Sequence, residues 1–168
     1  MNILNEMKVE FLSKSSNESF ARITASAFIA QLDPNIEEMS DVKTAVSEAV
    51  TNAIIHGYKN ALGVVTMMIR IFEDRCVEIT ILDKGAGIAD VAEARTPLFT
   101  TCDGEERSGM GFTVMETFMD QVEVFSALSE GTKVVMKKTL SKGNLYDACS
   151  RMRQPGYDRT FAGSEERK

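Results

Sequence analysis

Residues 47–57 read SEAVTNAIIHG and belong to a predicted amphipathic helix. Apolar side chains recur at helical spacing along this segment and the turns before it, at Val42, Ala45, Val46, Ala49, Val50 and Ala53. This stripe predicts a helix whose apolar face packs against a core. Ser40 or Asp41 is its expected N-cap, and Gly57 is its expected end.

Polar residues on the same helix point to a chemical role. Glu48, Asn52 and His56 follow one another at intervals of four residues, so they share one helical face. A carboxylate and a carboxamide beside a buried surface need a partner, and oxygen ligands suit Mg²⁺ bound together with phosphates. The alternative is the solvated edge of an amphipathic helix, and for His56 we favour a packing role.

The surrounding segments predict an α+β fold. An alternating strand covers residues 6–12, and a helix begins at Ser15, Ser16 or Asn17 and ends at Asp33-Pro34. Hairpins are expected over 64–82 and 121–138, with a helix over 112–119 between them. We therefore expect a two-layer sandwich in which helices cover one face of a mixed, mostly antiparallel sheet.

Composition excludes several classes of partner. The chain has 168 residues and a net charge of −6, which disfavours direct binding to nucleic acid phosphates. Three cysteines without a CxxC pair, and a single histidine, argue against a disulfide framework or a zinc site. No apolar run reaches the roughly 20 residues of a membrane span, and residues 1–14 lack signal-peptide features. We expect a cytoplasmic protein with one domain, residues 1–140, and a poorly ordered polar tail, residues 141–168.

A glycine-rich loop follows the second strand of the first hairpin. It reads Asp83-Lys84-Gly85-Ala86-Gly87-Ile88. Asp83 can accept a hydrogen bond, for example from an exocyclic amine, and the glycines allow backbone to approach a flat ligand. An ordinary turn at the end of a strand is the alternative.

A second glycine motif opens the helix after a long loop. It reads Arg107-Ser108-Gly109-Met110-Gly111. N–H groups at a helix start, together with the helix dipole, favour an anion or phosphate. The alternative is a helix cap with flexible glycines.

The order of these motifs resembles the GHKL, or Bergerat-fold, ATP-binding proteins. Within them the chain is most similar to the anti-sigma factor serine kinases of spore-forming bacteria. The resemblance covers about residues 5–138, and the stretches that carry it are NESFAR (17–22), SEAVTNAIIHGY (47–58), DKGAGI (83–88), PLFTT (97–101) and ERSGMGF (106–112).

The resemblance implies roles for individual residues. Asn52 is expected to ligate Mg²⁺, and Glu48 to act as general base. Asp83 is expected to read the adenine amino group with help from Thr132 through a water molecule, and Arg107 to neutralise charge on the γ-phosphate.

Further positions are expected to contact ATP. Two glycines lie beside the adenine, three residues donate N–H groups to the phosphates, and two threonines lie in a lid. They are, in that order, Gly85 and Gly87, then Ser108, Gly109 and Gly111, then Thr100 and Thr101.

The same resemblance implies an ATP-dependent protein serine kinase that is also an anti-sigma factor. Such a protein forms a homodimer, inhibits a sporulation sigma factor and phosphorylates a serine on an anti-anti-sigma partner. Glu18 and Arg22 on the first helix are candidates for a partner surface, with a solvated helix face as the alternative. One competing function is an ATP-dependent sigma-binding switch with little kinase activity. Another is a histidine kinase catalytic domain, which predicts an upstream phosphoacceptor histidine, whereas the single histidine is His56.

Overall fold

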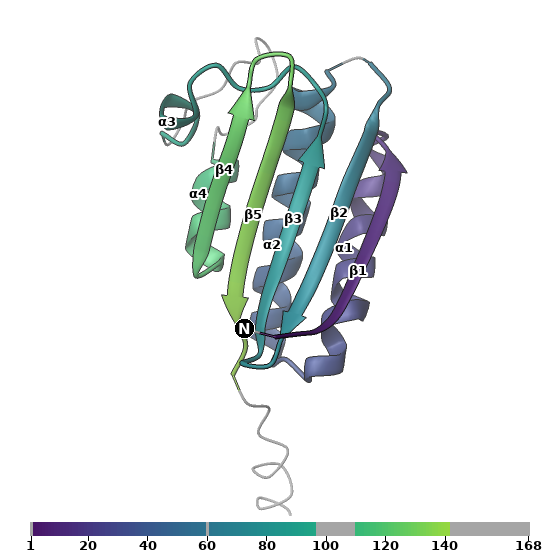
Figure 1. Cartoon of the computed structure of the whole chain (residues 1–168), viewed down its shortest axis with the longest axis vertical. Helices are drawn as coiled ribbons and strands as arrows, with labels where there is room; N and C mark the ends of the chain where they lie inside the picture. The colour runs from purple at the N-terminus through teal and green to yellow at the C-terminus, as the bar shows by residue number, and fades with distance from the viewer. Residues whose placement is uncertain (1, 60, 97–109, 142–168) are drawn as a thin grey trace, which may run out of the picture.

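The structure, a computed structural model, describes residues 2–59, 61–96 and 110–141. Within these residues five strands form one sheet in the order β1-β2-β3-β5-β4 (Figure 1). The strands are β1 (Ile3–Leu12), β2 (Val64–Phe72), β3 (Cys76–Asp83), β4 (Gln121–Ala127) and β5 (Gly131–Thr139).

Helices cover one face of this sheet, with α1, α2 and α4 behind it in Figure 1. The helical segments are α1 (Ser16–Ile29), η1 (Ala30–Leu32), α2 (Ile36–Asn52), η2 (Ala53–Gly57), α3 (Val91–Ala94) and α4 (Gly111–Phe118). The predicted two-layer α+β sandwich is therefore confirmed.

The sheet is antiparallel at each of its pairings in the described part of the chain. We expected a mixed sheet, and the difference has a topological reason. β4 runs in the same direction as β3, but β5 folds back and lies between them. The parallel neighbours that a mixed sheet requires are thus separated by the second strand of the hairpin.

The core lies between the sheet and α2. On β2 the inward positions Val65, Met67, Ile69 and Ile71 are buried, while the residues between them are half-buried or exposed. The apolar stripe of α2 predicted from residues 42–53 is buried against them. Burying such side chains supplies the main driving force for folding, at roughly 25 cal/mol per Å² of apolar area.

Helix α2 begins earlier than predicted, at Ile36 with Asn35 as its N-cap. Asn35 Oδ1 accepts from Glu38 N at 2.8 Å, and Glu38 Oε2 accepts from Asn35 N at 3.0 Å. This capping box satisfies two helix-end N–H groups and replaces the expected cap at Ser40 or Asp41. The apolar pattern did not indicate this first turn, because the apolar residue at its start, Ile36, is 92% exposed.

The last described residue, Ser141, is held by hydrogen bonds at the end of the molecule where α2 begins. Arg75 donates to the carbonyls of Leu32 and Ser141, each at 2.6 Å, and Glu38 Oε1 accepts from Ser141 N at 2.6 Å. The chain therefore reaches residue 141 at the pole of the sheet opposite the loop that follows β3 (Figure 1).

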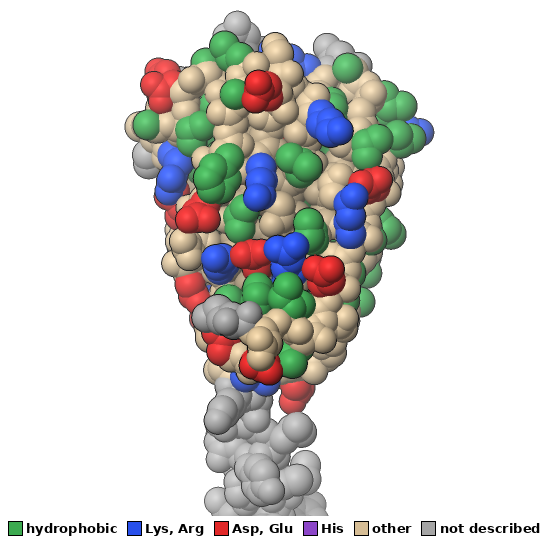
Figure 2. All heavy atoms as spheres, viewed as in Figure 1, with side chains coloured by type: hydrophobic (Ala, Val, Ile, Leu, Met, Phe, Trp, Pro, Cys, Tyr) green, Lys and Arg blue, Asp and Glu red, His purple; other side chains and the backbone are tan. Residues whose placement is uncertain are grey.

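The outer face of the sheet carries mixed charges and scattered apolar side chains (Figure 2). Arg70 joins Glu6 at 3.1 Å and Glu78 at 3.5 Å, and Lys137 reaches Glu78 at 3.4 Å. Exposed pairs of this kind add little stability. Among the described residues, no helix combines the length and apolar character needed to cross a bilayer.

Candidate functional site

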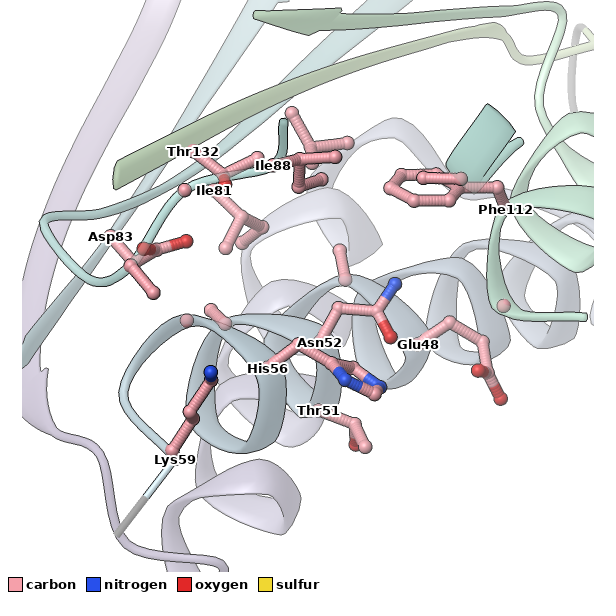
Figure 3. A pocket seen from close by; sticks show the side chains of 18 of the residues that line it. Glu48, Thr51, Asn52, His56, Lys59, Ile81, Asp83, Ile88, Phe112 and Thr132 are labelled. Atoms are coloured by element: carbon pink, nitrogen blue, oxygen red, sulfur yellow. The ribbon is translucent and has the colours of Figure 1, made fainter. Parts of the chain in front are cut away.

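A cavity of about 800 Å³ lies between α2, η2, the ends of β3 and β5, and the start of α4. Its volume falls within the range of roughly 300–1,000 Å³ typical of small-molecule sites. Asp83 and Glu48 lie toward opposite ends of the cavity, with His56 and Asn52 between them (Figure 3). The polar face of α2 at Glu48 and Asn52 therefore forms part of the wall of this cavity.

A buried carboxylate defines one end of the cavity. Asp83 is 3% exposed, and its Oδ1 accepts from Gly85 N at 2.9 Å. Burial raises the pKa of Asp83, while hydrogen bonds from the N–H groups of Gly85 and Thr132 act in the opposite direction. Asp83 pairs with Thr132 across β3 and β5, so the sheet register brings both residues to the same wall.

The glycines of this end allow three backbone segments to touch. A Cβ on Gly85 would lie 2.0 Å from the carbonyl oxygen of Gly57, and one on Gly87 would lie 1.9 Å from that of Ala127. Gly87 and Gly131 also have positive φ angles, +69° and +90°. Gly87 lines the cavity, but Gly85 does not. The glycine at position 85 is therefore required by the protein's own backbone, which is a different reason from the close ligand approach expected from sequence.

Tyr58 fixes the glycine loop from the other side. Its hydroxyl accepts from Lys84 N at 2.9 Å and donates to the carbonyl of Val64 at 2.6 Å. Ala86 N also donates to the carbonyl of Gly57 at 2.7 Å. Gly57 closes a π-helical turn, Ala53–Gly57, a widened form that is frequent at functional sites. Sequence reasoning assigned Tyr58 no role, although the residue lies within a quoted motif.

The opposite end brings together α2 and the first residue of α4. A Cβ on Gly111 would lie 3.2 Å from both Asn52 Nδ2 and Glu48 Oε2. The start of α4, where the helix dipole is positive and the N-cap Met110 makes no side-chain cap hydrogen bond, thus lies beside a carboxylate and a carboxamide. The described residues contain no group of three or more His, Cys, Asp or Glu side chains able to hold a metal ion.

The predicted site residues differ in where the structure places them, and Gly85 is the predicted ligand-contact residue of the described part of the chain that does not line the cavity. Those that line the cavity are Glu48, Asn52, Asp83, Gly87, Gly111 and Thr132. Arg107, Ser108, Gly109, Thr100 and Thr101 lie outside the described residues. Glu18, predicted for a partner surface, also lines the cavity, whereas Arg22 contacts Ser47 and Ser19.

Several lining residues were not predicted. Lys59, Ile88 and Phe112 belong to the wall (Figure 3). Each of them directly follows one of the quoted motifs or is its last residue. Their position next to a motif was therefore the only sequence feature that could have indicated them. No periodicity or charge pattern distinguished these three residues from their neighbours.

The model of the histidine kinase-like ATPase domain matches residues 14–138. The chain belongs to this family. Family membership covers the entire cavity, because all the residues that line it fall within the matched range.

Relatives within the ATPase family are similar over nearly their whole length. An anti-sigma F factor of Clostridium perfringens strain SM101 is 59% identical over 138 residues, 82% of this chain and 98% of the relative. An anti-sigma F factor of Geobacillus thermodenitrificans is 55% identical over 138 residues, 82% and 94% respectively.

A solved structure of low sequence identity shares the fold. The RsbU and RsbW domains of a Mycobacterium tuberculosis protein superpose with a TM-score of 0.61 at 16% identity. The match covers 82% of this chain and 32% of that longer chain. At this identity the likeness supports the sandwich architecture alone.

Membership of an ATPase family implies ATP binding, and the cavity fits that ligand. A buried acceptor, Asp83, lies at one end, and a helix start lies at the other. This arrangement, with an acceptor at one end and helix N–H groups at the other, suits a base held by hydrogen bonds and phosphates held near N–H groups. Asn52 offers a carboxamide oxygen of the kind that Mg²⁺ accepts when phosphates supply its other ligands.

Asp83→Asn is expected to weaken ATP binding by about 10- to 100-fold, because hydrogen bonds to a charged group contribute about 1.5–3 kcal/mol. The wild type should also lose affinity as the pH falls, since protonation removes an acceptor. Burial raises the pKa of Asp83, so this loss begins at a higher pH than for an exposed aspartate. Titration calorimetry with ATP between pH 8 and pH 5 measures both effects.

Other ionisable residues, among them Glu48, His56 and Asp90, also line the cavity, so the pH dependence of the wild type alone does not report on Asp83. The quantity to compare is therefore the ATP affinity of the wild type with that of Asp83→Asn at each pH. The ratio of wild-type to variant affinity should shrink toward acid pH. A ratio that stays constant across this range would show that the ionised Asp83 does not contact the ligand.

Proposed function

We propose that this chain is an ATP-dependent protein serine kinase and anti-sigma factor. It binds a sporulation sigma factor of the sigma F type and phosphorylates a serine on an anti-anti-sigma partner. One observation carries the proposal: Glu48 and Asn52 share a cavity wall with the start of α4, in a chain 55–59% identical to proteins named anti-sigma F factor.

The chemistry assigned to the cavity is transfer of the γ-phosphate of ATP to a serine hydroxyl. Asp83 and Thr132, which line one wall, hold the adenine amino group, and Gly111, the first residue of α4, donates its N–H to the phosphates. The Glu48 carboxylate accepts the proton of the attacking hydroxyl as the bond to phosphorus forms, and ADP leaves. Asn52 holds Mg²⁺, which when bound offsets negative charge on the phosphates.

Residues outside the described part of the chain complete the proposal. Arg107 neutralises charge on the γ-phosphate, and Ser108 and Gly109 donate N–H groups to the phosphates. Thr100 and Thr101 belong to the lid. The glycine motif that contains Arg107 adjoins Gly111, which lies against Asn52 and Glu48, and this adjacency supports the three phosphate contacts.

A partner surface on α1 belongs to the same proposal. Phe20 and Ile23 are 48% and 63% exposed, and Arg22 lies 3.9 Å from Glu18 on this helix. Exposed apolar groups beside charges are typical of recognition surfaces. The protein acts as a homodimer in the cytoplasm, where its sigma factor works.

The catalytic domain spans residues 1–140 in this proposal, and residues 141–168 are its polar C-terminal tail. The family model ends at residue 138, and the relatives match over 138 residues.

The test incubates the full chain with labelled ATP, Mg²⁺, the sigma factor and the anti-anti-sigma protein encoded in the same genome. Label on a serine of the anti-anti-sigma protein is the expected result. ATP-dependent capture of the sigma factor without label would replace the kinase with a binding switch. Absence of both label and capture would refute the proposal.

A further inference from the structure

The hydroxyl of Ser126 lies at the centre of a small hydrogen-bond network behind the Asp83 end of the cavity. Ile88 N donates to Ser126 Oγ at 2.8 Å, and Ser126 Oγ donates to the carbonyl of Gly131 at 2.8 Å. Thr132 Oγ1 lies 2.9 Å from the same oxygen. Ser126 faces Thr132 across β4 and β5, does not line the cavity itself and has no role in the proposed reaction.

Counting protons assigns the direction of each bond. A hydroxyl group has one hydrogen to donate and two lone pairs to accept with. The amide of Ile88 can only donate and the carbonyl of Gly131 can only accept, so Ser126 gives its hydrogen to Gly131. The remaining lone pair of Ser126 must then accept from Thr132 Oγ1.

This assignment fixes what Thr132 presents to the cavity. Its hydrogen is used by Ser126, so toward a ligand the Thr132 hydroxyl offers lone pairs only. Asp83, the adjacent polar side chain on this wall, is also an acceptor when ionised. Two acceptors side by side favour a ligand edge that carries N–H groups and disfavour one that carries an oxygen.

We propose that Ser126 is a positioning residue that makes the site prefer adenine to guanine by holding the Thr132 hydrogen away from the cavity. Adenine presents an amino group at the position where guanine presents a carbonyl oxygen. An unpaired or repelled polar group in a buried site is costly, which makes such discrimination effective. The inference rests on the proposed ATP site and adds its base specificity.

The second contact of Ser126 supports the same role. By accepting from Ile88 N, Ser126 fixes the backbone of a residue whose side chain lines the cavity (Figure 3). Ser129 N also donates to the carbonyl of Ala86 at 2.8 Å, so the β4–β5 hairpin holds the glycine loop at two points. Ser126 therefore orients the base end of the cavity without touching the ligand.

The test compares binding of ATP and GTP, each with Mg²⁺, by titration calorimetry on the full chain. Ser126→Ala frees the Thr132 hydrogen to turn toward a guanine oxygen. We expect the ratio of ATP to GTP affinity to fall by about tenfold, the equivalent of one hydrogen bond of about 1.4 kcal/mol, with GTP affinity rising. Ser126→Thr keeps a hydroxyl and should restore the wild-type ratio.

If Ser126 only stabilised the fold, Ser126→Ala would lower the affinities for ATP and GTP by the same factor. A rise in GTP affinity therefore distinguishes a role in base specificity from a purely structural one. Thr66→Ala is the control, because it removes a hydroxyl on the outer face of the sheet, where Thr66 contacts Glu10. It should leave both affinities unchanged. If the wild type prefers ATP and Ser126→Ala has the same ratio of ATP to GTP affinity, the inference about Ser126 is wrong while the proposed ATP site stands. A wild type that binds neither nucleotide overturns the proposed ATP site and the inference with it.

Discussion

Glu48→Ala is expected to lower phosphoryl transfer to the partner serine by about 100-fold or more, while ATP still binds. The reason is positional, because Glu48 lies at the end of the cavity that faces the start of α4, away from Asp83 (Figure 3). Removing a carboxylate near the phosphates also removes a repulsion, so ATP affinity should be unchanged or higher. Single-turnover transfer of label and ATP titration measure the two quantities.

Glu37→Ala is the matched control for this variant. Glu37 lies on the same helix, in the exposed first turn of α2, and does not line the cavity. It should transfer phosphate at the wild-type rate. Transfer by Glu48→Ala at a rate close to that of Glu37→Ala would remove Glu48 from the role of general base.

Gly85→Ala is expected to lower both the stability of the domain and its affinity for ATP. The added Cβ would lie 2.0 Å from the oxygen and 2.3 Å from the carbonyl carbon of Gly57, both backbone atoms that cannot turn away. Forcing an atom into such a contact costs about 3 kcal/mol, which corresponds to a fall in Tm of about 10 °C. The loop must then separate from η2, which displaces Asp83 from its N–H partner and should weaken ATP binding by more than about tenfold.

Gly111→Ala provides the comparison for stability. Among the described residues, the atoms nearest to its Cβ would be the ends of the Asn52 and Glu48 side chains, at 3.2–3.3 Å, and these can shift. Calorimetry should therefore show a Tm for Gly111→Ala at or near that of the wild type. A Gly85→Ala protein that melts with the wild type would contradict the close approach of Gly85 and Gly57.

Sequence patterns predicted the architecture well where periodicity was strong. The stripe of residues 42–53 corresponds to a buried face. The alternation of residues 6–12 corresponds to a half-buried face, on which Phe11 is buried and Met7 and Val9 are partly buried. The start of α2 was missed because its first turn is exposed, and its signal was the polar pair Asn35 and Glu38. The mixed sheet was wrong because hairpin patterns do not show which strand lies next to β3.

The candidate site was partly predictable. The order of the motifs predicted that Glu48, Asn52, Asp83 and Thr132 belong to one site, and in the structure all four line the same cavity. Long-range contacts were not predictable, because they depend on tertiary approach between distant segments. One example is the close approach of the Gly85 and Gly57 backbones, which leaves no room for a side chain at position 85. Another is the hydrogen bond from Ile88 N to Ser126 Oγ.

Amide hydrogen exchange of the full chain, with and without ATP and Mg²⁺, tests the central claim that this cavity binds ATP. The account predicts slower exchange at residues 84–88, at residues 48–58 and at Thr132, which together line or support the cavity. Strand β1, at the far edge of the sheet, should exchange at the same rate in both conditions. Unchanged exchange at 84–88 and 48–58 under saturating ATP would contradict the account.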